Sequence, residues 1–501
     1  MLKHMLGNST ALRKDGALSD SKVPATISDA IELVKGVGER YLWVDALCIV
    51  QDDPGLQKAQ LAQMGLIYSL AAFTIVAASG NDANAGLPGV RADTRDINQN
   101  LVRVGERILL EVVDGHGYYG GLKKSSWSTR AWTMQEKILS KKLLIFTDQQ
   151  VYWSCWNAVW LEEVVLEDVF NISFLHDPVK TGPADVGFSS IVKSRDMYEL
   201  YESLVNAYQE RQLTFKSDIL NAFSGLCQAM AMIGNESFHW GLPVSHFDRY
   251  LCWYLRGGGT RNYAFCSPDK GGSAVFSVPF PSWSWAAWHG TSGSSWISWT
   301  ADVNQDASRP EIIFFGYDTE GRLKQINQSL STPAGLETRV PKDFQPEKTV
   351  DLPSQWKGDP QIIHEAFCKA PINTGLLHFW TSMATLSVRQ EPNPLGTQYS
   401  AVAFRHGHRV EIDALAYLQF EDVEAMPKSP EGISKEPIKG AKIYKILAMD
   451  FVAVSSYNTS NLHALVVEWK DGVAYRIGVA SFMQSDWIGL PNKVWKRVVL
   501  G

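Results

Sequence analysis

The chain has 501 residues, of which 45% are hydrophobic and 20% charged, and its formal net charge is −6. A chain of this length is expected to form about two to four domains, and the composition excludes global disorder. The small net charge, without a long Lys/Arg run, indicates no nucleic acid or anionic membrane partner. The 6 cysteines form no Cys-x-x-Cys pair, which is typical of reduced thiols in a cytoplasmic protein.

Helix and strand patterns alternate at the start of the chain. Residues 26–40 carry apolar residues at helical spacing, and residues 41–50 (YLWVDALCIV) form an apolar run of strand length. A helix over residues 57–70 and a buried strand over 74–79 follow. The uncharged run at 64–79 is too short and too polar for a membrane span, so we expect none.

The same alternation continues to about residue 160. We expect strands over 108–114, 143–148 and 151–155, and a short helix over 132–139. Strands that alternate with helices, and that are apolar along their whole length, are typical of a parallel sheet covered on both faces. Residues 1–160 are therefore predicted to be an α/β domain.

The rest of the chain changes character three times. Residues 161–195 hold prolines and glycines and are interpreted as a connector. Residues 196–300 are first helical and then rich in aromatic residues, and residues 301–501 are mixed and mainly β. Two alternating runs in 462–482 flank Lys470-Asp471-Gly472, which predicts a β-hairpin.

Several stretches together resemble the fungal heterokaryon incompatibility (HET) domain. They are RYLWVDALCIVQDD (40–53), MGLIYSLAAFTIVAASG (64–80), GLPG (86–89), SSWSTRAWTMQEKILSKKLLIF (125–146) and VYWSC (151–155). Three later stretches resemble the region that often follows this domain: RQLTFKSDILNAFSG (211–225), FHWGLP (238–243) and PSWSWAAWHG (281–290).

The resemblance implies a role in regulated cell death after non-self recognition, with protein partners or self-association. It also implies distant kinship to TIR domains, which have a flavodoxin-like fold and some of which hydrolyse NAD. In those, a glutamate lies four residues after a tryptophan, a spacing that Trp132 and Glu136 match. NAD would be the substrate, and no cofactor or metal is implied.

The family usually opens with a strand of the form YxxLSYxWG, and this sequence begins with MLKHMLGNST instead. The expected fold is therefore a TIR-like, flavodoxin-like parallel sheet with flanking helices that is incomplete at its N-terminus, followed by an α+β C-terminal region. The alternatives to a NAD hydrolase are a non-enzymatic signalling or protein-interaction module, and an inactive, truncated member of the family.

Glu136 has two interpretations. A carboxylate can stabilise the positive charge that builds on a ribose when an N-glycosidic bond breaks, and Trp132 at i−4 would share its helical face. Alternatively, Thr133-Met134-Gln135-Glu136 is a T-x-x-E capping box that begins a helix.

Four neighbours are supporting candidates. Arg130 either binds a ligand phosphate or pairs with Asp45 or Asp52, and Gln135 flanks the same site. Asp45 interrupts an apolar run and needs a partner if it is buried. Asp52 follows the predicted strand at the end where α/β sheets bind ligands, although it or Asp53 would equally cap the next helix.

Three other features favour structural roles. GHGYYG (115–120) satisfies G-x-G-x-x-G but precedes a polar loop rather than a helix. Cys48 has no histidine nearby in the sequence and is expected to be a buried small hydrophobe rather than a nucleophile. The tryptophan-rich PSWSWAAWHG (281–290) is expected to fill a core or an interface rather than to bind an aromatic ligand.

Overall fold

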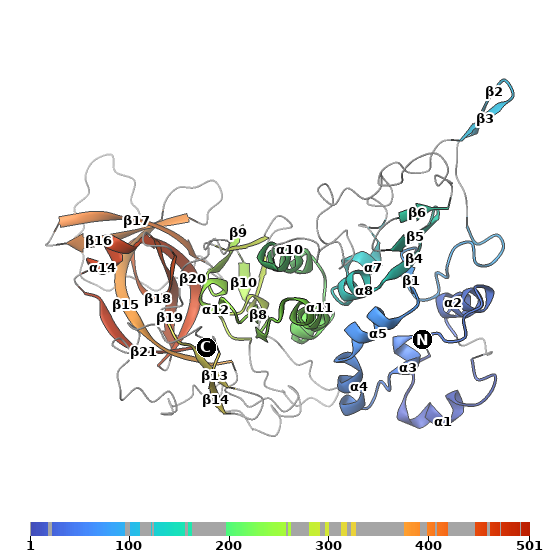
Figure 1. Ribbon diagram of the computed structural model, residues 1–501, viewed down its shortest axis with the longest axis horizontal. Coiled ribbons are helices and arrows are strands. Elements are labelled where there is room, and N and C mark those ends of the chain that lie inside the picture. Colours follow the sequence, from blue (N-terminus) through green and yellow to red (C-terminus); the bar gives the residue numbers. More distant parts are fainter. Residues whose placement is uncertain are drawn as a thin grey trace. The chain divides into compact units, whose positions relative to one another are not determined.

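The computed structural model describes residues 2–18, 23–95, 101–110, 122, 125–155, 159–162, 197–256, 259–261, 280–290, 296–299, 312–317, 322–326, 375–390, 398–405, 408–418, 446–457, 461–470, 472–490 and 492–501. The chain divides into unit 1 (Met1–Thr214 and Asn221–Ile233) and unit 2 (Phe215–Leu220 and Gly234–Gly501) (Figure 1). The GHGYYG segment and the predicted connector after residue 162 lie outside the described residues.

Unit 1 is built on a mixed four-stranded sheet. Its strands are β1 (Thr74–Ala77), β4 (Lys142–Phe146), β5 (Val151–Cys155) and β6 (Val159–Leu161), in the order β1-β4-β5-β6. The α/β class and the strands β1, β4 and β5 confirm the sequence prediction, whereas β6 was not predicted. The sheet is not wholly parallel, however. Only β1 and β4 are parallel, because a tight turn in which the Thr147 amide donates to the Gln150 carbonyl reverses the chain into β5.

Unit 1 has helices of 3 to 16 residues. They are η1 (Leu6–Asn8), α1 (Ser9–Leu12), α2 (Ala25–Gly36), α3 (Asp45–Cys48), α4 (Pro54–Leu61), α5 (Met64–Leu70), α7 (Ser126–Thr129), α8 (Trp132–Leu139), α10 (Met197–Gln209) and most of α11 (Ile219–Gly234). The α8 helix has the predicted bounds. The predicted helix over 57–70 is instead two helices, α4 and α5, separated by residues 62–63.

Apolar side chains cover both faces of the sheet. On one face Ala30 of α2 packs with Leu87 and Phe146. On the other face Trp127 of α7 packs with Val76 and Ile145. Alternate residues of β1 and β4 thus point to two separate clusters, as the pleat requires. Figure 1 shows α2 on one side of these strands and α7 and α8 on the other.

The predicted strand over 41–50 is wrong. Residues 41–44 form no ladder, and the chain turns into α3, where the Cys48 amide donates to the Val44 carbonyl at 2.7 Å. A strand needs a neighbour to satisfy its backbone groups, and none pairs with this segment in the described part of the chain. Cys48 is exposed, which corrects the prediction that it is buried.

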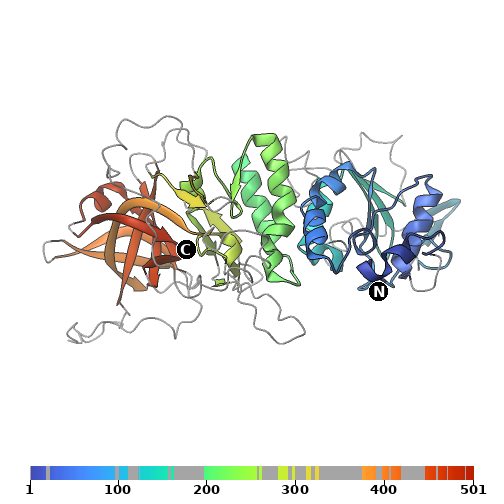
Figure 2. The same ribbon diagram turned by 90° about the horizontal axis from the view of Figure 1, so that it is seen from below.

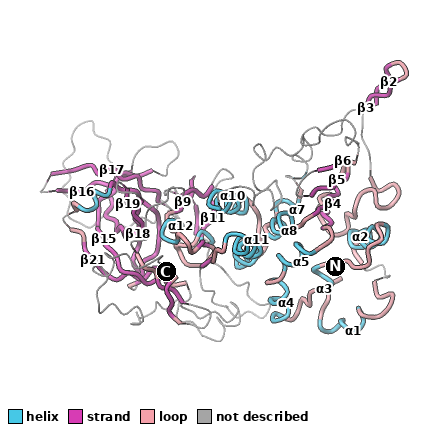
Figure 3. The backbone as a smooth tube through the Cα atoms, viewed as in Figure 1, coloured by secondary structure: helices cyan, strands magenta, loops and turns pink. Residues whose placement is uncertain are grey.

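The predicted strand over 108–114 is also placed differently. Its first residues form β3 (Arg107–Leu110), which among the described residues pairs only with β2 (Leu101–Val104), in an antiparallel hairpin apart from the main sheet (Figure 3). Residues 111–114 lie outside the described residues. The hairpin exposes Val102 and Ile108 to solvent, so the apolar run did not mark a core strand.

Unit 2 is mainly β. Its elements are η4 (Lys216–Asp218), β7 (Phe238–His239), β8 (Leu242–Pro243), α12 (Phe247–Tyr250), β9 (Trp253–Arg256), β10 (Gly259–Arg261), η5 (Trp285–Ala287), β11 (Trp288–Gly290), β12 (Trp296–Trp299), β13 (Phe315–Tyr317), β14 (Leu323–Gln325), β15 (Leu377–Gln390), β16 (Gln398–Arg405), β17 (His408–Leu418), β18 (Ile446–Tyr457), β19 (Asn461–Lys470), β20 (Val473–Met483), α14 (Gln484–Ile488) and β21 (Val494–Leu500).

The long strands of unit 2 pair in a closed ring. β15 pairs with β16 and β18, and the antiparallel path β16-β17-β20-β19-β18 joins those two neighbours (Figure 2). The predicted hairpin is confirmed as β19 and β20, joined through Gly472 at φ +80°. Trp283, Trp285 and Trp288 of PSWSWAAWHG are buried, which confirms their core role.

Candidate functional site

Glu136 lies inside α8 and does not cap it. The helix begins at Trp132, and its N-cap residue, Ala131, makes no side-chain cap bond. The Thr133 hydroxyl instead donates to the carbonyls of Trp127 at 2.5 Å and Arg130 at 2.8 Å. Because Thr133 lies one position inside the helix and bonds backwards, the capping-box interpretation is wrong.

Two aromatic side chains hold the Glu136 carboxylate. Trp127 Nε1 donates to Glu136 Oε2 at 3.0 Å, and the Tyr68 hydroxyl also hydrogen-bonds to the carboxylate. The Trp127 ring is fixed by the sheet cluster and by its short helix α7, which Ser125 caps by accepting from the Ser128 amide at 3.2 Å. Tyr68 comes from α5 and meets the Trp43 ring edge-on, with centroids 5.9 Å apart.

The surroundings raise the pKa of Glu136. Burial is the largest cause, and the charge of Asp45 acts in the same direction. The hydrogen bond from Trp127, the positive charge of Arg130 and the hydrogen bond from Tyr68 act in the opposite direction but do not cancel the burial. Burial and the Glu136 charge raise the pKa of the Tyr68 phenol well above its ordinary value, so Tyr68 remains a donor at neutral pH.

Three of the residues predicted from the sequence therefore come together. Glu136 is half-buried on α8, while Arg130 just before α8 and Asp45 in the first turn of α3 are exposed and close enough to act on its charge. No ion pair joins Arg130 to Asp45 or to Asp52 among the residues that the structure describes. We call Asp45, Tyr68, Trp127, Arg130 and Glu136 the Glu136 cluster.

The other candidates lie elsewhere or have other partners. Gln135 is fully buried against α11, where a Cβ on Gly225 would stand 2.4 Å from its Oε1. Asp52 accepts the Leu6 amide at 2.8 Å, and Asp53 accepts the Leu56 amide at 2.9 Å in the first turn of α4, as the capping alternative predicted. Trp132, the first residue of α8, is half-buried.

Tyr68 and Trp127 were not predicted as site residues. Trp127 is nine positions from Glu136, a separation that brings two side chains together only when two short helices are joined by a bend. Tyr68 belongs to another helix. The sequence did hold one signal, because a tyrosine inside the apolar run at 64–79 needs a partner for its hydroxyl once it is buried.

Residues 3–136 match the sequence profile of a family described as heterokaryon incompatibility protein (HET). The chain contains a HET domain. No curated protein and no solved structure matches the chain. The family resemblance predicted from the sequence is thereby confirmed for this part of the chain, and the matched region includes every member of the Glu136 cluster.

The GLPG stretch of the HET domain is fixed by a buried carboxylate. Asp29 of α2 pairs with Arg91 Nε at 2.6 Å and accepts the Leu87 amide at 2.8 Å. Gly86 stands at φ +80°, and a Cβ there would lie 2.7 Å from Asp29 Oδ2, so the motif needs glycine for both backbone and space. The pair ties the loop after β1 to α2.

No group of three or more His, Cys, Asp or Glu side chains that would hold a metal occurs within the described ranges. Likewise, none of the described helices combines the length and the apolar character that crossing a bilayer requires.

Proposed function

We propose that the HET domain is TIR-like and that it hydrolyses NAD at the Glu136 cluster, as the effector step of cell-death signalling after non-self recognition. One observation carries the proposal: Glu136 has no capping role, and its carboxylate is held by Trp127 Nε1 at 3.0 Å and by the Tyr68 hydroxyl in a partly dehydrated site. A partly buried carboxylate with a raised pKa and fixed donors is a common feature of catalytic sites.

The chemistry needs the ionised form of Glu136. The bond between the ribose C1′ and the nicotinamide nitrogen breaks, and its electron pair leaves with nicotinamide. Positive charge develops on the ribose, and a carboxylate fixed beside it stabilises that charge more strongly than water does. Water then adds to C1′ and releases a proton, which yields ADP-ribose.

The other members of the cluster have supporting roles in this proposal. Trp127 and Tyr68 orient the Glu136 carboxylate through one hydrogen bond each. Arg130 is exposed beside it and suits a ligand pyrophosphate, which guanidinium groups bind well. Trp132 lies one helical turn before Glu136 and offers an aromatic wall for the nicotinamide ring.

Incubation of the purified full chain with NAD tests this function. We expect release of nicotinamide and ADP-ribose in equal amounts, measured by chromatography. A well-folded wild-type chain at high concentration that releases no nicotinamide would contradict the proposal.

A second candidate function is that of a non-enzymatic signalling or protein-interaction module. It is favoured by β1, which lies at the end of the strand order and has one unpaired edge among the described residues. Such edges accept a strand from another chain. Expression of wild type and Glu136→Gln in a fungal host separates the two functions, because the module predicts that the variant still triggers death and the hydrolase predicts that it does not.

A further inference from the structure

Unit 1 holds a pocket that shares no residue with the Glu136 cluster. Its volume is about 350 Å³, and its apolar wall is formed by Leu33, Val37, Val90, Phe146 and Val151. This volume falls within the range of small-molecule sites. Phe146 is the last residue of β4, so the pocket lies at the carboxyl end of a parallel strand, where α/β sheets bind ligands.

The loop that forms one side of the pocket is fixed in place. Pro88, Gly89 and Val90 line the pocket just after the segment that Asp29 ties to α2. Gly89 stands at φ +90°, and a Cβ there would lie 3.2 Å from Cζ of Arg95. The Arg95 guanidinium therefore lies against the Gly89 backbone, and the wall is formed before a ligand arrives.

The single guanidinium of the pocket is already neutralised. Arg95 Nη1 and Nη2 each donate to a Glu162 oxygen at 2.6 Å, and Glu162 also accepts the Val151 amide at 2.9 Å. Burial alone would raise the pKa of Glu162, but the hydrogen bonds from Arg95 and Val151 outweigh it and hold that pKa below its ordinary value. The charge of Arg95 is thus compensated by Glu162, although its buried Nε has no hydrogen-bond partner among the described residues.

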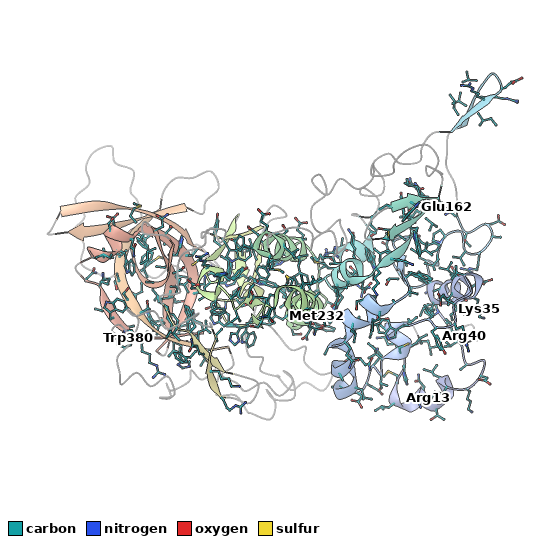
Figure 4. All side chains as sticks on the ribbon, viewed as in Figure 1. Arg13, Lys35, Arg40, Glu162, Met232 and Trp380 are labelled. Atoms are coloured by element: carbon teal, nitrogen blue, oxygen red, sulfur yellow. The ribbon has the colours of Figure 1, made fainter. Side chains whose placement is uncertain are left out.

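Once Arg95 and Glu162 compensate each other, the net charge of the side chains that line the pocket is negative. Glu32 lines the pocket and is exposed, and Gly36, the last residue of α2, and its C-cap residue Val37 also line it, so the negative end of the helix dipole faces the pocket. Lys35 is the basic residue of the last turn and is exposed, but it does not line the pocket. Figure 4 labels Lys35 on α2 and Glu162 beside β6.

We propose that this pocket binds a small organic cation with an apolar body, such as an aromatic amidine. The apolar body packs on Phe146, Leu33 and Val90, and the cation lies between Glu32 and the C-terminal end of α2. This assignment concerns a second site and does not depend on hydrolysis at Glu136.

Three ligands of one size and shape test the charge preference: benzamidine, benzamide and benzoate, which are positive, neutral and negative. Titration of the full chain, followed by calorimetry or ligand-detected NMR, is expected to give the tightest binding for benzamidine and the weakest for benzoate. Glu32→Gln should lower the preference for benzamidine over benzamide about threefold to tenfold. Glu210→Gln removes the same charge from an exposed position outside the pocket and should change nothing.

A second variant tests the location. Val90→Trp fills the pocket and should remove binding of all three compounds while the far-UV spectrum and melting temperature stay those of a folded chain. Benzoate binding as tightly as benzamidine, benzamidine binding unchanged in Val90→Trp, or no binding of benzamidine to wild type would each overturn the proposal. Glu136 is intact in every protein used, so these outcomes are independent of NAD hydrolysis.

Discussion

The indole of Trp127 donates to the Glu136 carboxylate at 3.0 Å, which joins the two short helices α7 and α8 through one partly buried hydrogen bond. Trp127 is 8% exposed and packs on the sheet. The position of the carboxylate is therefore set by the core of unit 1 rather than by the helix on which Glu136 lies.

Removal of this donor should change the pH dependence of activity. The Trp127 hydrogen bond lowers the pKa of Glu136, so Trp127→Phe should raise that pKa further. The proposed hydrolysis requires the ionised carboxylate, so the activity should be lost as pH falls through the pKa of Glu136. The acidic limb of the pH–rate profile should thus move to higher pH in the variant, and the maximal rate should fall about threefold to tenfold.

The matched control is Trp153→Phe, which changes a tryptophan of β5 that packs near Phe73 and Lys142 instead. It should leave the acidic limb where wild type has it. An equal shift in both variants would mean that lost packing, rather than the lost hydrogen bond, moves the limb.

Two charges near Glu136 should move the same limb in opposite directions. The negative charge of Asp45 raises the pKa of Glu136, so Asp45→Asn should move the acidic limb to lower pH. The positive charge of Arg130 lowers that pKa, so Arg130→Gln should move the limb to higher pH. Both shifts should shrink at 1 M salt, since exposed charges are screened there. Shifts in the same direction would show that the limb reports another group.

The buried amide of Gln135 should lower the free energy of unfolding of the wild-type chain. Its side chain is fully buried, and neither amide atom has a hydrogen-bond partner among the described residues. Gln135→Met keeps the length of the side chain and removes the unpaired polar atoms, so urea unfolding should give a free energy about 1–2 kcal/mol larger than in wild type. A smaller free energy of unfolding would mean that the amide has a partner in solution.

The ion pair between Asp29 and Arg91 should stabilise the GLPG loop and the fold of unit 1. Asp29 is buried while the Arg91 side chain is 51% exposed, so part of the attraction is screened by solvent. Asp29→Asn keeps an acceptor for the Leu87 amide but removes the charge, and should lower the free energy of unfolding by about 1–3 kcal/mol. Hydrogen exchange at Leu87 should quicken. Unchanged stability and exchange in Asp29→Asn would show that the charge contributes nothing.

Sequence patterns predicted those elements whose structure depends mainly on neighbouring residues. The bounds of α8 follow from its apolar spacing, and β5 and the β19–β20 hairpin follow from strand runs beside turn residues. The run at 41–50 has the same apolar character but no partner strand among the described residues, so it failed as a strand. Whether an apolar run pairs is decided by distant residues, which periodicity does not report.

Only part of the candidate site was predicted, because some of its contacts also depend on residues that are distant in the sequence. Glu136, Arg130 and Asp45 were identified from residue type and family resemblance. Tyr68 and Trp127 were missed because their contacts with Glu136 depend on how α5 and α7 pack against α8. The capping-box prediction failed because the Thr133 hydroxyl donates to backbone carbonyls of the preceding turn. Such bonds compete with the bond that a capping hydroxyl makes to a backbone amide of the first helical turn.

The central claim is that the Glu136 carboxylate performs the chemistry, and Glu136→Gln tests it most directly. Glutamine keeps the size of the side chain and an acceptor for Trp127 and Tyr68 but has no charge. At pH 7 the variant should release nicotinamide from NAD at least about 100-fold more slowly than wild type, with an unchanged circular dichroism spectrum. Release at the wild-type rate by the folded variant would contradict the account.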